Sequence, residues 1–452
     1  MYGDEEMSSE LAFFGGPKAV QSEPGDIFTW PIITKEIEDA VLEVLRAGKM
    51  SDLDVTMQFE KEFSEWLGAM HALAHNTGTA ALHGAMFGIG IGHGDEIICP
   101  STTYWASCLQ VYSLGGTVVF ADIDPEMLCI DPKDIEHRIT PRTKAVMVVH
   151  YLGMPADMDA IMEIAERHGL KVIEDVSHAH GALYKGKMVG TFGDVAGFSL
   201  MSGKSLPCGE GGMMATNDKR IYERAVAFGH YARHNDLTLE DLKAGAGLPW
   251  GGYKYRMHQL TSAMGRVQLK YYRKSMAEID KAMNYFWDLL EGVPGIKAHR
   301  PPKGSGTTMG GWYAPHGLCR PEELRGLSIQ RFCEAVRAEG APCLPGCNRA
   351  LHLHPIFNTI DIYGQGKPTR VANSPAGIDV RQPLGSLAVS EGIQERVFTI
   401  PWFKHYRPGI IEEYAYAFRK VAENYEELLP GDIRRDESIG GWRTTRMIRD
   451  TQ

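Results

Sequence analysis

Residues 158–175 read MDAIMEIAERHGLKVIED, which is one complete helix-and-strand unit. Apolar residues at helical spacing predict a helix over Met158–His168, and Gly169 is the kind of residue that ends a helix. The short apolar run over 170–174 then predicts a strand. Runs of this kind between helices are typical of buried strands in a mostly parallel sheet.

The same alternation continues on both sides of this unit and predicts an α/β fold with a mostly parallel central sheet. The expected helices cover residues 36–49, 57–67, 79–88, 104–114 and 257–290. The expected strands cover residues 96–99, 117–122, 145–150, 197–200 and 212–216.

The pattern changes beyond Pro294, where a sequence rich in Pro and Gly with mixed helix and strand signals predicts a second, smaller α+β domain. We therefore expect an N-terminal arm over 1–30, a large α/β domain over 31–285, a small C-terminal domain over 286–429 and a polar tail over 430–452.

Composition excludes several classes of protein. The chain has 452 residues, a net charge of −10 and no run of Lys or Arg, which argues against nucleic acid as a partner. The acidic residues 1–6 lack the apolar core of a secretory signal, and no apolar run approaches the length of a membrane span. The eight cysteines fit no zinc pattern, so we expect reduced thiols, no metal site and a cytoplasmic protein.

Asp175 and Lys204 are the first candidates for chemistry. Asp175 stands at the end of an expected strand, where ligands of open α/β sheets gather; a helix N-cap is the alternative use. Lys204 lies within residues 197–212, which read GFSLMSGKSLPCGEGG. Small residues allow a ligand to approach closely, and a desolvated lysine has a lowered pKa and can form a Schiff base. An ordinary loop lysine is the alternative.

A candidate anion site precedes them in the chain. Residues 76–82 read NTGTAAL and open an expected helix, so Gly78 and Thr79 could offer free N–H groups and a hydroxyl to a phosphate. Plain N-capping by Asn76 or Thr77 is the alternative.

Two other patterns argue against nicotinamide binding and against a metal site. The glycines at 88, 90, 92 and 94 do not have the dinucleotide-binding spacing, which disfavours a nicotinamide oxidoreductase. His352 and His354 lack the carboxylate or cysteine neighbours of a metal site, so substrate contact or packing is the expected role.

The chain resembles the DegT/DnrJ/EryC1/StrS family in the order of its candidate residues along the sequence. That order is Gly78-Thr79, an aromatic residue after Pro100, Asp175, Ser199 and Lys204. Its members are sugar aminotransferases that depend on pyridoxal 5'-phosphate (PLP) and have fold type I. The resemblance covers roughly residues 25–425 and is most specific over 150–160, 174–182 and 199–212. It implies a homodimer with shared active sites, and pyridoxamine phosphate as the form of the cofactor that carries the amino group.

The resemblance also implies roles for single residues. Lys204 would form the Schiff base with PLP and carry the proton in the transfer step. Asp175 would keep the pyridine nitrogen protonated, which makes the ring an electron sink. The remaining implied contacts are His178 with the phenolic oxygen, Tyr104 (or the adjacent Trp105) stacked on the ring, Gly78, Thr79 and Ser199 with the phosphate, and His352 near the amino donor or acceptor.

The chain departs from the family at one position. The family often reads Gly-Tyr-Asn-Tyr-Arg-Met where residues 252–257 read GYKYRM, so Lys254 replaces an Asn that reaches the partner subunit's phosphate. A lysine can serve a phosphate as a point charge. Family members that dehydrate sugars carry His in place of Lys204, so the lysine favours transamination.

The expected function is therefore transfer of an amino group from glutamine or glutamate to a ketone on a polyhydroxylated ring. The opening Phe14-Gly15-Gly16-Pro17, Lys254 and the long C-terminal half resemble the cyclitol branch of the family, which implies a keto-cyclitol such as scyllo-inosose as acceptor, with a nucleotide-linked keto-sugar as the alternative. Another PLP enzyme of the same fold, such as a lyase or an oxidase, and a non-catalytic regulator that kept the fold, are the remaining alternatives.

Overall fold

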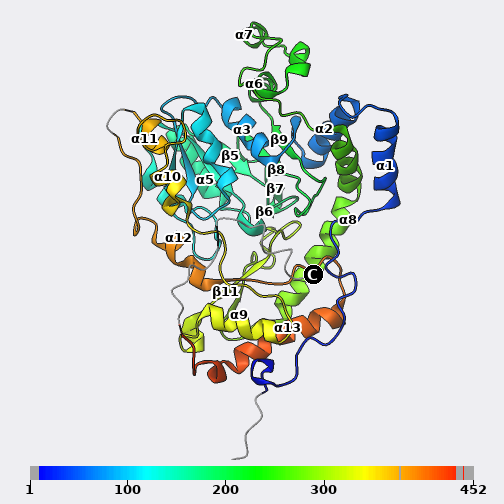
Figure 1. Ribbon diagram of the computed structural model, residues 1–452, viewed down its shortest axis with the longest axis vertical. Helices are drawn as coiled ribbons and strands as arrows, with labels where there is room; N and C mark the ends of the chain where they lie inside the picture. The colour runs from blue at the N-terminus through cyan, green and yellow to red at the C-terminus, as the bar shows by residue number, and fades with distance from the viewer. Residues whose placement is uncertain (1–9, 376–377, 434–440, 442–452) are drawn as a thin grey trace, which may run out of the picture.

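The computed structural model describes residues 10–375, 378–433 and 441. The predictions for the acidic residues 1–6 and for most of the polar tail over 430–452 lie outside the described residues. The molecule is elongated, with a large sheet and its helices at one end and a small sheet with further helices at the other (Figure 1).

A seven-stranded sheet forms the centre of the larger part, in the order β1-β9-β8-β5-β4-β2-β3. Strand β9 is antiparallel to both of its neighbours, and the other neighbouring pairs are parallel. The strands are β1 (His71–His75), β2 (Glu96–Pro100), β3 (Thr117–Ala121), β4 (Thr143–Val149), β5 (Lys171–Asp175), β8 (Val195–Ser199) and β9 (Gly212–Thr216).

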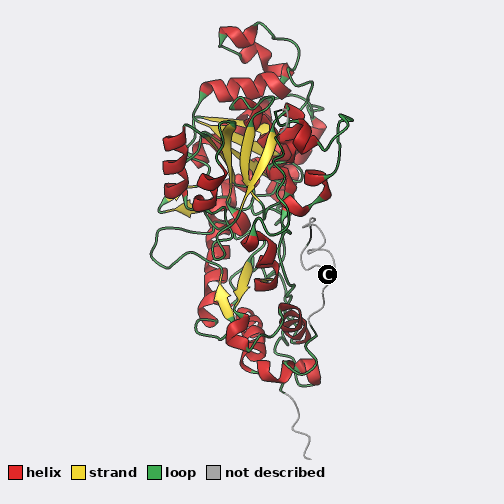
Figure 2. Cartoon of the chain, turned by 90° about the vertical axis from the view of Figure 1, so that its left-hand side faces the viewer, coloured by secondary structure: helices red, strands yellow, loops and turns green. Residues whose placement is uncertain are grey.

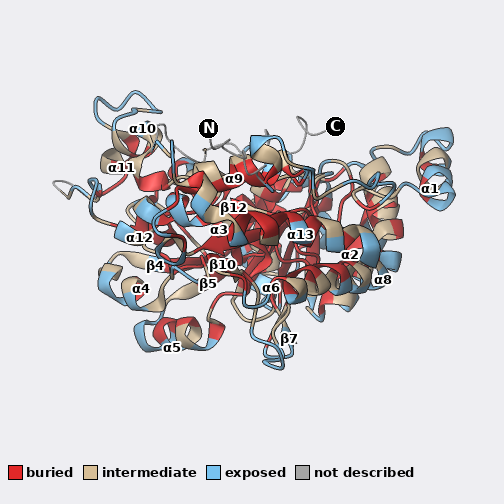
Figure 3. Ribbon diagram, turned by 90° about the horizontal axis from the view of Figure 1, so that it is seen from below, coloured by how far each residue is buried: buried red, intermediate tan, exposed pale blue. Residues whose placement is uncertain are grey.

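Helices cover both faces of this sheet (Figure 2), which is why its strands are buried along most of their length. Figure 3 shows the strands buried and the outer helices exposed on one side only. The longer described helices are α1 (Lys35–Arg46), α2 (Asp54–Leu67), α3 (Gly78–Gly88), α5 (Met158–His168), α6 (Lys219–Gly229), α8 (Gln259–Leu289), α9 (Ile329–Ala338) and α13 (Pro408–Glu423).

Helix α8 has 31 residues and connects the two ends of the molecule (Figure 1). It packs on α1 and α2 at one end and on α13 at the other. The smaller part contains the antiparallel strands β10 (Ile296–Ala298), β11 (His316–Cys319) and β12 (Val397–Thr399). A short hairpin, β6 (Leu183–Tyr184) and β7 (Lys187–Met188), stands apart from both sheets.

The structure differs from the sequence prediction at several elements, and helix α6, for example, was not predicted. Strand β1 was not predicted, because the sequence HALAH over His71–His75 has no β-branched residue and carries little strand signal. Residues 104–114 were predicted as one helix but form two 3₁₀ turns, Trp105–Ser107 and Leu109–Leu114, since the backbone of Cys108 between them is not helical. The boundary proposed between residues 285 and 286 falls inside α8, and the domain division stays a prediction.

One segment of the C-terminal half lies on the large sheet. The side chain of Gln382 pairs with both backbone groups of Phe120, at 2.9 Å and 2.6 Å, and Arg370 Nε donates to Val118 O at 2.9 Å. These bonds satisfy backbone groups of the edge strand β3 that have no neighbouring strand. The short helices of this region are α10 (Pro355–Asn358), α11 (Thr369–Ala372) and α12 (Ala388–Gly392).

Candidate active site

The candidate site lies where β5 and β8 end. Asp175 is the last residue of β5 and Ser199 the last residue of β8, and the register pairs Asp175 with Gly197. Both strands end at the same edge because they are parallel, and Lys204 follows in the loop from β8 to β9. The crossover arrangement therefore brings together residues that are far apart in the sequence.

Asp175 is 5% exposed, and both of its carboxylate oxygens have donors. Ser107 Oγ donates to Oδ2 at 2.7 Å, and the Ser177 N–H donates to Oδ1 at 3.0 Å. In the part of the chain that the structure describes, no helix begins in the turn after β5, so the N-cap alternative is wrong. The carboxylate is held in place and remains available to a cationic ligand group.

Lys204 is 8% exposed, and its Nζ lies 3.9 Å from the centre of the Tyr313 ring. Burial lowers the pKa of Lys204 to about 7, although the charge of Asp175 partly offsets this effect. The Trp30 indole N–H donates to the carbonyl of Lys204 at 2.8 Å, which fixes the loop. A buried amine that loses its proton near neutral pH is suited to Schiff-base formation, unlike an ordinary loop lysine.

His178 lies beside Lys204, between aromatic rings. Its ring centre is 4.6 Å from that of Tyr313 and 5.7 Å from that of Tyr151. Burial, and secondarily the charge of Lys204, holds the pKa of His178 well below its usual range, so the ring is neutral. Because Nδ1 accepts the Leu152 N–H at 3.3 Å, Nε2 carries the proton and can donate to a ligand oxygen.

Helix α3 begins directly against β8. Its first intrahelical bond runs from Ala81 N to Thr77 O, so the N–H groups of Gly78 and Thr79 precede it. A Cβ on Gly78 would lie 2.6 Å from the Cβ of Ser199, which only glycine avoids. Thr77 does cap the helix, accepting from Ala80 N at 3.0 Å, so the capping alternative holds for Thr77 and leaves Gly78 and Thr79 free for an anion.

Tyr104 belongs to the segment that covers Asp175. Its ring centre is 5.0 Å from that of Trp105, and Ser107 in the same segment donates to Asp175. The Ser107 bond ties this segment to the site, and the choice between Tyr104 and Trp105 as the stacking residue stays a prediction.

The contacts that Lys254 and His352 make within one chain are with residues other than Asp175, Ser199 and Lys204. Lys254 is exposed, with Nζ 6.0 Å from the centre of the Tyr231 ring. Its loop is tied to the start of α3, because Asn76 N donates to Tyr255 O at 2.7 Å. His352 is fully buried, with Ser101 and Glu391 hydrogen-bonded to its two ring nitrogens.

The residues present fit PLP. A buried amine that is neutral near pH 7 suits the aldehyde, a buried carboxylate suits a protonated ring nitrogen, and a helix start with free N–H groups suits the phosphate. The backbone of Gly212 packs directly against the same helix start, since a Cβ on Gly212 would lie 2.3 Å from Thr77 O.

Several residues of the site were not predicted from the sequence. Ser107 and Ser177 hold Asp175, and Trp30 and Tyr313 flank Lys204. Ser107 and Ser177 had a weak signal, because they are hydroxyl residues within three positions of predicted ones. Trp30 and Tyr313 had none, since only the tertiary fold brings them to Lys204.

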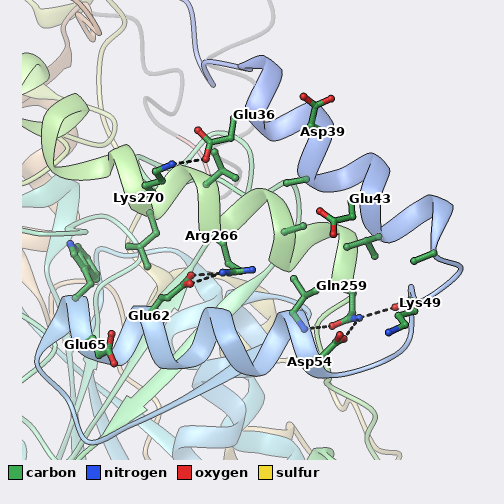
Figure 4. A pocket seen from close by; sticks show the side chains of 18 of the residues that line it. Glu36, Asp39, Glu43, Lys49, Asp54, Glu62, Glu65, Gln259, Arg266 and Lys270 are labelled. Atoms are coloured by element: carbon green, nitrogen blue, oxygen red, sulfur yellow. Dashed lines mark hydrogen bonds and ion pairs between the residues drawn. The ribbon is translucent and has the colours of Figure 1, made fainter.

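A second hollow, of about 1000 Å³, lies over α8 between α1 and α2 (Figure 4). Its charged residues largely pair with one another, as Arg266 does with Glu62 at 2.7 Å and Lys270 with Glu36 at 2.7 Å. None of the predicted site residues lines this groove, so it is separate from the chemistry.

Comparison with known proteins places the chain in a family. The model of the DegT/DnrJ/EryC1/StrS aminotransferase family matches residues 31–377. A GDP-perosamine synthase of Caulobacter vibrioides is 40% identical over 258 residues, which are 55% of this chain and 65% of that protein. An L-glutamine:2-deoxy-scyllo-inosose aminotransferase of Streptomyces kanamyceticus is 32% identical over 363 residues, which are 78% of this chain and 83% of that protein.

The fold comparison agrees. The crystal structure of an aminotransferase from Psychrobacter cryohalolentis superposes with a TM-score of 0.76 at 28% identity, covering 88% of this chain and all of that one. Among the described residues, no helix combines the length and apolar character needed to cross a membrane. With its mostly parallel sheet and its family match, the chain is an aminotransferase of the DegT/DnrJ/EryC1/StrS family, with the fold of that family's PLP enzymes.

Proposed function

We propose that this aminotransferase uses PLP bound at Lys204 to move an amino group from glutamine or glutamate to a keto-cyclitol such as scyllo-inosose. The observation that carries the chemistry is the buried Lys204 amine, which has a pKa of about 7 and lies in the field of the Asp175 carboxylate. When bound, PLP supplies an electron sink for the carbon that loses its proton.

The protein side chains then have distinct tasks. Lys204, whose pKa of about 7 leaves it partly neutral near pH 7, can accept a proton from the substrate carbon that bears the nitrogen and return it on the far side of that nitrogen, which is a 1,3-shift. Asp175 keeps the ring nitrogen protonated, and Ser107 and Ser177 keep Asp175 in place. His178 donates from Nε2 to the phenolic oxygen, and Gly78, Thr79 and Ser199 hold the phosphate.

A half-reaction tests this proposal. The PLP-loaded enzyme, mixed with glutamine or glutamate, is expected to lose its visible cofactor absorbance and to release one equivalent of 2-oxo acid. Absorbance that no amino acid changes would favour a non-catalytic regulator. Consumption of the amino acid without formation of pyridoxamine phosphate would instead favour a lyase or an oxidase.

The acceptor rests on the comparisons. The L-glutamine:2-deoxy-scyllo-inosose aminotransferase matches 78% of this chain at 32% identity, and the GDP-perosamine synthase matches 55% at 40% identity. The longer match supports the cyclitol, and the higher identity keeps the nucleotide-linked keto-sugar as the alternative to be tested. The pyridoxamine form, offered scyllo-inosose and nucleotide keto-sugars in separate reactions, is expected to regain its visible absorbance at least tenfold faster with the keto-inositol. The reverse preference would assign the enzyme to nucleotide sugars.

A homodimer with shared sites is also part of the proposal. Lys254 is exposed in its own chain, and large apolar side chains near it are exposed as well: Leu248 at 77% and Trp250 at 42%. We propose that this surface meets the partner and that Lys254 serves the partner's phosphate. A cytoplasmic location is proposed too, supported by eight cysteines that are all free thiols.

Hybrid dimers test the sharing of sites. Lys204→Ala and Lys254→Glu are each expected to be weakly active alone. A hybrid of the two regains one intact site only if Lys254 acts across the interface, so mixing after dissociation should raise activity severalfold. Hybrids no more active than their parents would place Lys254 in its own chain's site.

A further inference from the structure

A closed hydrogen-bond chain joins Ser101, His352 and Glu391. Ser101 Oγ lies 2.7 Å from Nδ1 of His352, and Nε2 lies 3.0 Å from Glu391 Oε1. Ser101 and His352 are fully buried. Both ring nitrogens of His352 are therefore already occupied by protein groups.

The donors in this chain can be assigned. The Glu391 carboxylate can only accept, so Nε2 carries the ring proton and donates it to Glu391. In the neutral ring Nδ1 then accepts from the Ser101 hydroxyl, whose Oγ in turn accepts the His352 backbone N–H at 3.3 Å. A doubly protonated ring would leave the Ser101 hydroxyl proton without an acceptor in this chain, and burial lowers the pKa of His352 further although Glu391 opposes the shift.

Glu391 is itself fixed. Its carboxylate accepts from Gly385 N at 2.8 Å and 2.9 Å and from Leu387 N at 3.1 Å. The other charged groups that act on His352 are Arg370 and Asp122, and Asp122 is bound to Ser390 at 2.7 Å. The whole arrangement ties the segment from Leu351 to α12 to the large sheet.

Ser101 is the point where this segment reaches the candidate site. It follows β2 directly, its carbonyl accepts from Leu351 N at 2.8 Å, and its own N–H donates to Ala121 O at 3.0 Å. Tyr104 stands three residues further on, and Ser107 in the same segment donates to Asp175. Movement of Ser101 would therefore displace the residues that cover the cofactor ring.

We infer that Glu391 and Ser101 are positioning residues, which hold His352 as a neutral clamp on residues 101–107 and leave its ring no free nitrogen for substrate. This inference rests on the proposed cofactor site for its functional consequence. It replaces the expected substrate contact of His352 with an indirect role.

Three variants test it: Glu391→Gln, Ser101→Ala and, as matched control, the exposed Glu395→Gln four residues along the chain. In the PLP-loaded enzyme, the first two are expected to change the visible circular dichroism of the bound cofactor and to lower kcat at least fivefold, with KM for donor and acceptor within twofold. Glu395→Gln should resemble the wild type. A cofactor signal unchanged in both variants would overturn the inference.

His352→Gln separates the two roles of the histidine. A direct substrate contact predicts a KM raised at least tenfold for one substrate with an unchanged cofactor signal, and this result would also overturn the inference. A further readout does not depend on the reaction. Amide hydrogen exchange in peptides covering residues 101–107 should rise at least twofold in Glu391→Gln but not in Glu395→Gln, and no rise would refute the clamp even if the wild type proved inert with every amino donor.

Discussion

Lys204 shows how burial turns an ordinary side chain into a reactive one. A lysine in water keeps its proton up to about pH 10.4. Here burial outweighs the attraction of Asp175 and brings the pKa of Lys204 to about 7. The amine is thus largely neutral, and reactive toward an aldehyde, at pH values where other lysines are charged.

The first prediction concerns PLP attachment to the cofactor-free enzyme. Since only the neutral amine attacks, the rate should rise about tenfold per pH unit below pH 7 and level off above about pH 8. Stopped-flow absorbance across this range measures it, with borohydride trapping and mass spectrometry to locate the bond on Lys204. A rate that still climbs at pH 9 would mean that Lys204 is not desolvated, and Lys204→Ala should show no covalent attachment at all.

Asp175→Asn is the second prediction. The amide keeps an acceptor for Ser177 or Ser107 but cannot hold a proton on the ring nitrogen, so kcat should fall on the order of 10²-fold or more, with little loss of folding. Steady-state kinetics and thermal denaturation of the same sample measure the two effects. Wild-type turnover in this variant would refute the ring-nitrogen role.

At this scale the sequence predicted the two central residues and missed their supports. Asp175 and Lys204 lie in motifs that can be recognised from the sequence alone. Tyr313 is more than a hundred positions from Lys204, and its contact arises only when β11 and its preceding loop reach the large sheet. His352 was predicted to lie near substrate, and its burial between Ser101 and Glu391 could not be read from local spacing.

Among the elements, α3 determines how the phosphate is held. Its start lies so close to β8 that a side chain at position 78 has no room. Gly78→Ala should push α3 away from Ser199, lower the free energy of unfolding by about 1–3 kcal/mol and weaken PLP binding by about tenfold. Denaturant unfolding and titration with PLP measure these changes.

Gly92→Ala is the matched control, because the nearest atom to its added Cβ would be an Asp95 oxygen at 3.9 Å and its backbone φ is not positive. It should leave PLP affinity unchanged. If Gly78→Ala bound PLP as tightly as Gly92→Ala, the start of α3 would not be the phosphate site.

Local signals decided how well each element was predicted. Helix α5 has the predicted bounds because Asp157 caps its start and Gly169, at φ +64°, ends it. Strand β1 has no such signal and exists because β9 offers it an antiparallel partner along five residues. Caps and turns depend on neighbouring residues and can be predicted from them, whereas an edge position in a sheet depends on the assembled fold.

For the whole molecule, the N-terminal arm connects the two ends. Ile27 O accepts from Lys404 N at 2.8 Å, and Trp30 reaches the Lys204 carbonyl. The side chain of Lys404 is buried with Nζ over the rings of Trp30 and Trp402, and among the described residues no group hydrogen-bonds to it. This junction of arm, small sheet and Lys204 loop could not be predicted, since residues 1–30 have no periodicity.

Burial without a partner holds the pKa of Lys404 well below its ordinary value. The unfolded chain therefore binds more protons than the folded one between the two pKa values, so this lysine makes stability rise with pH up to about pH 10.4. Lys404→Met removes the cost while filling the same space. We expect the variant to be more stable than the wild type by about 1 kcal/mol or more near pH 7, net of the lost attraction to the rings, with the advantage shrinking as pH rises.

Lys420→Met is the control that separates burial from pairing. Lys420 is as buried as Lys404, but its Nζ donates to Glu339 Oε2 at 2.9 Å and to Pro17 O at 2.7 Å. Its loss should destabilise the protein at neutral pH, because Glu339 would be left as a buried, unpaired charge. Denaturant unfolding of the cofactor-free protein at several pH values compares the two. A Lys404→Met variant less stable than the wild type at pH 7 would contradict the prediction and show that Lys404 stabilises this junction.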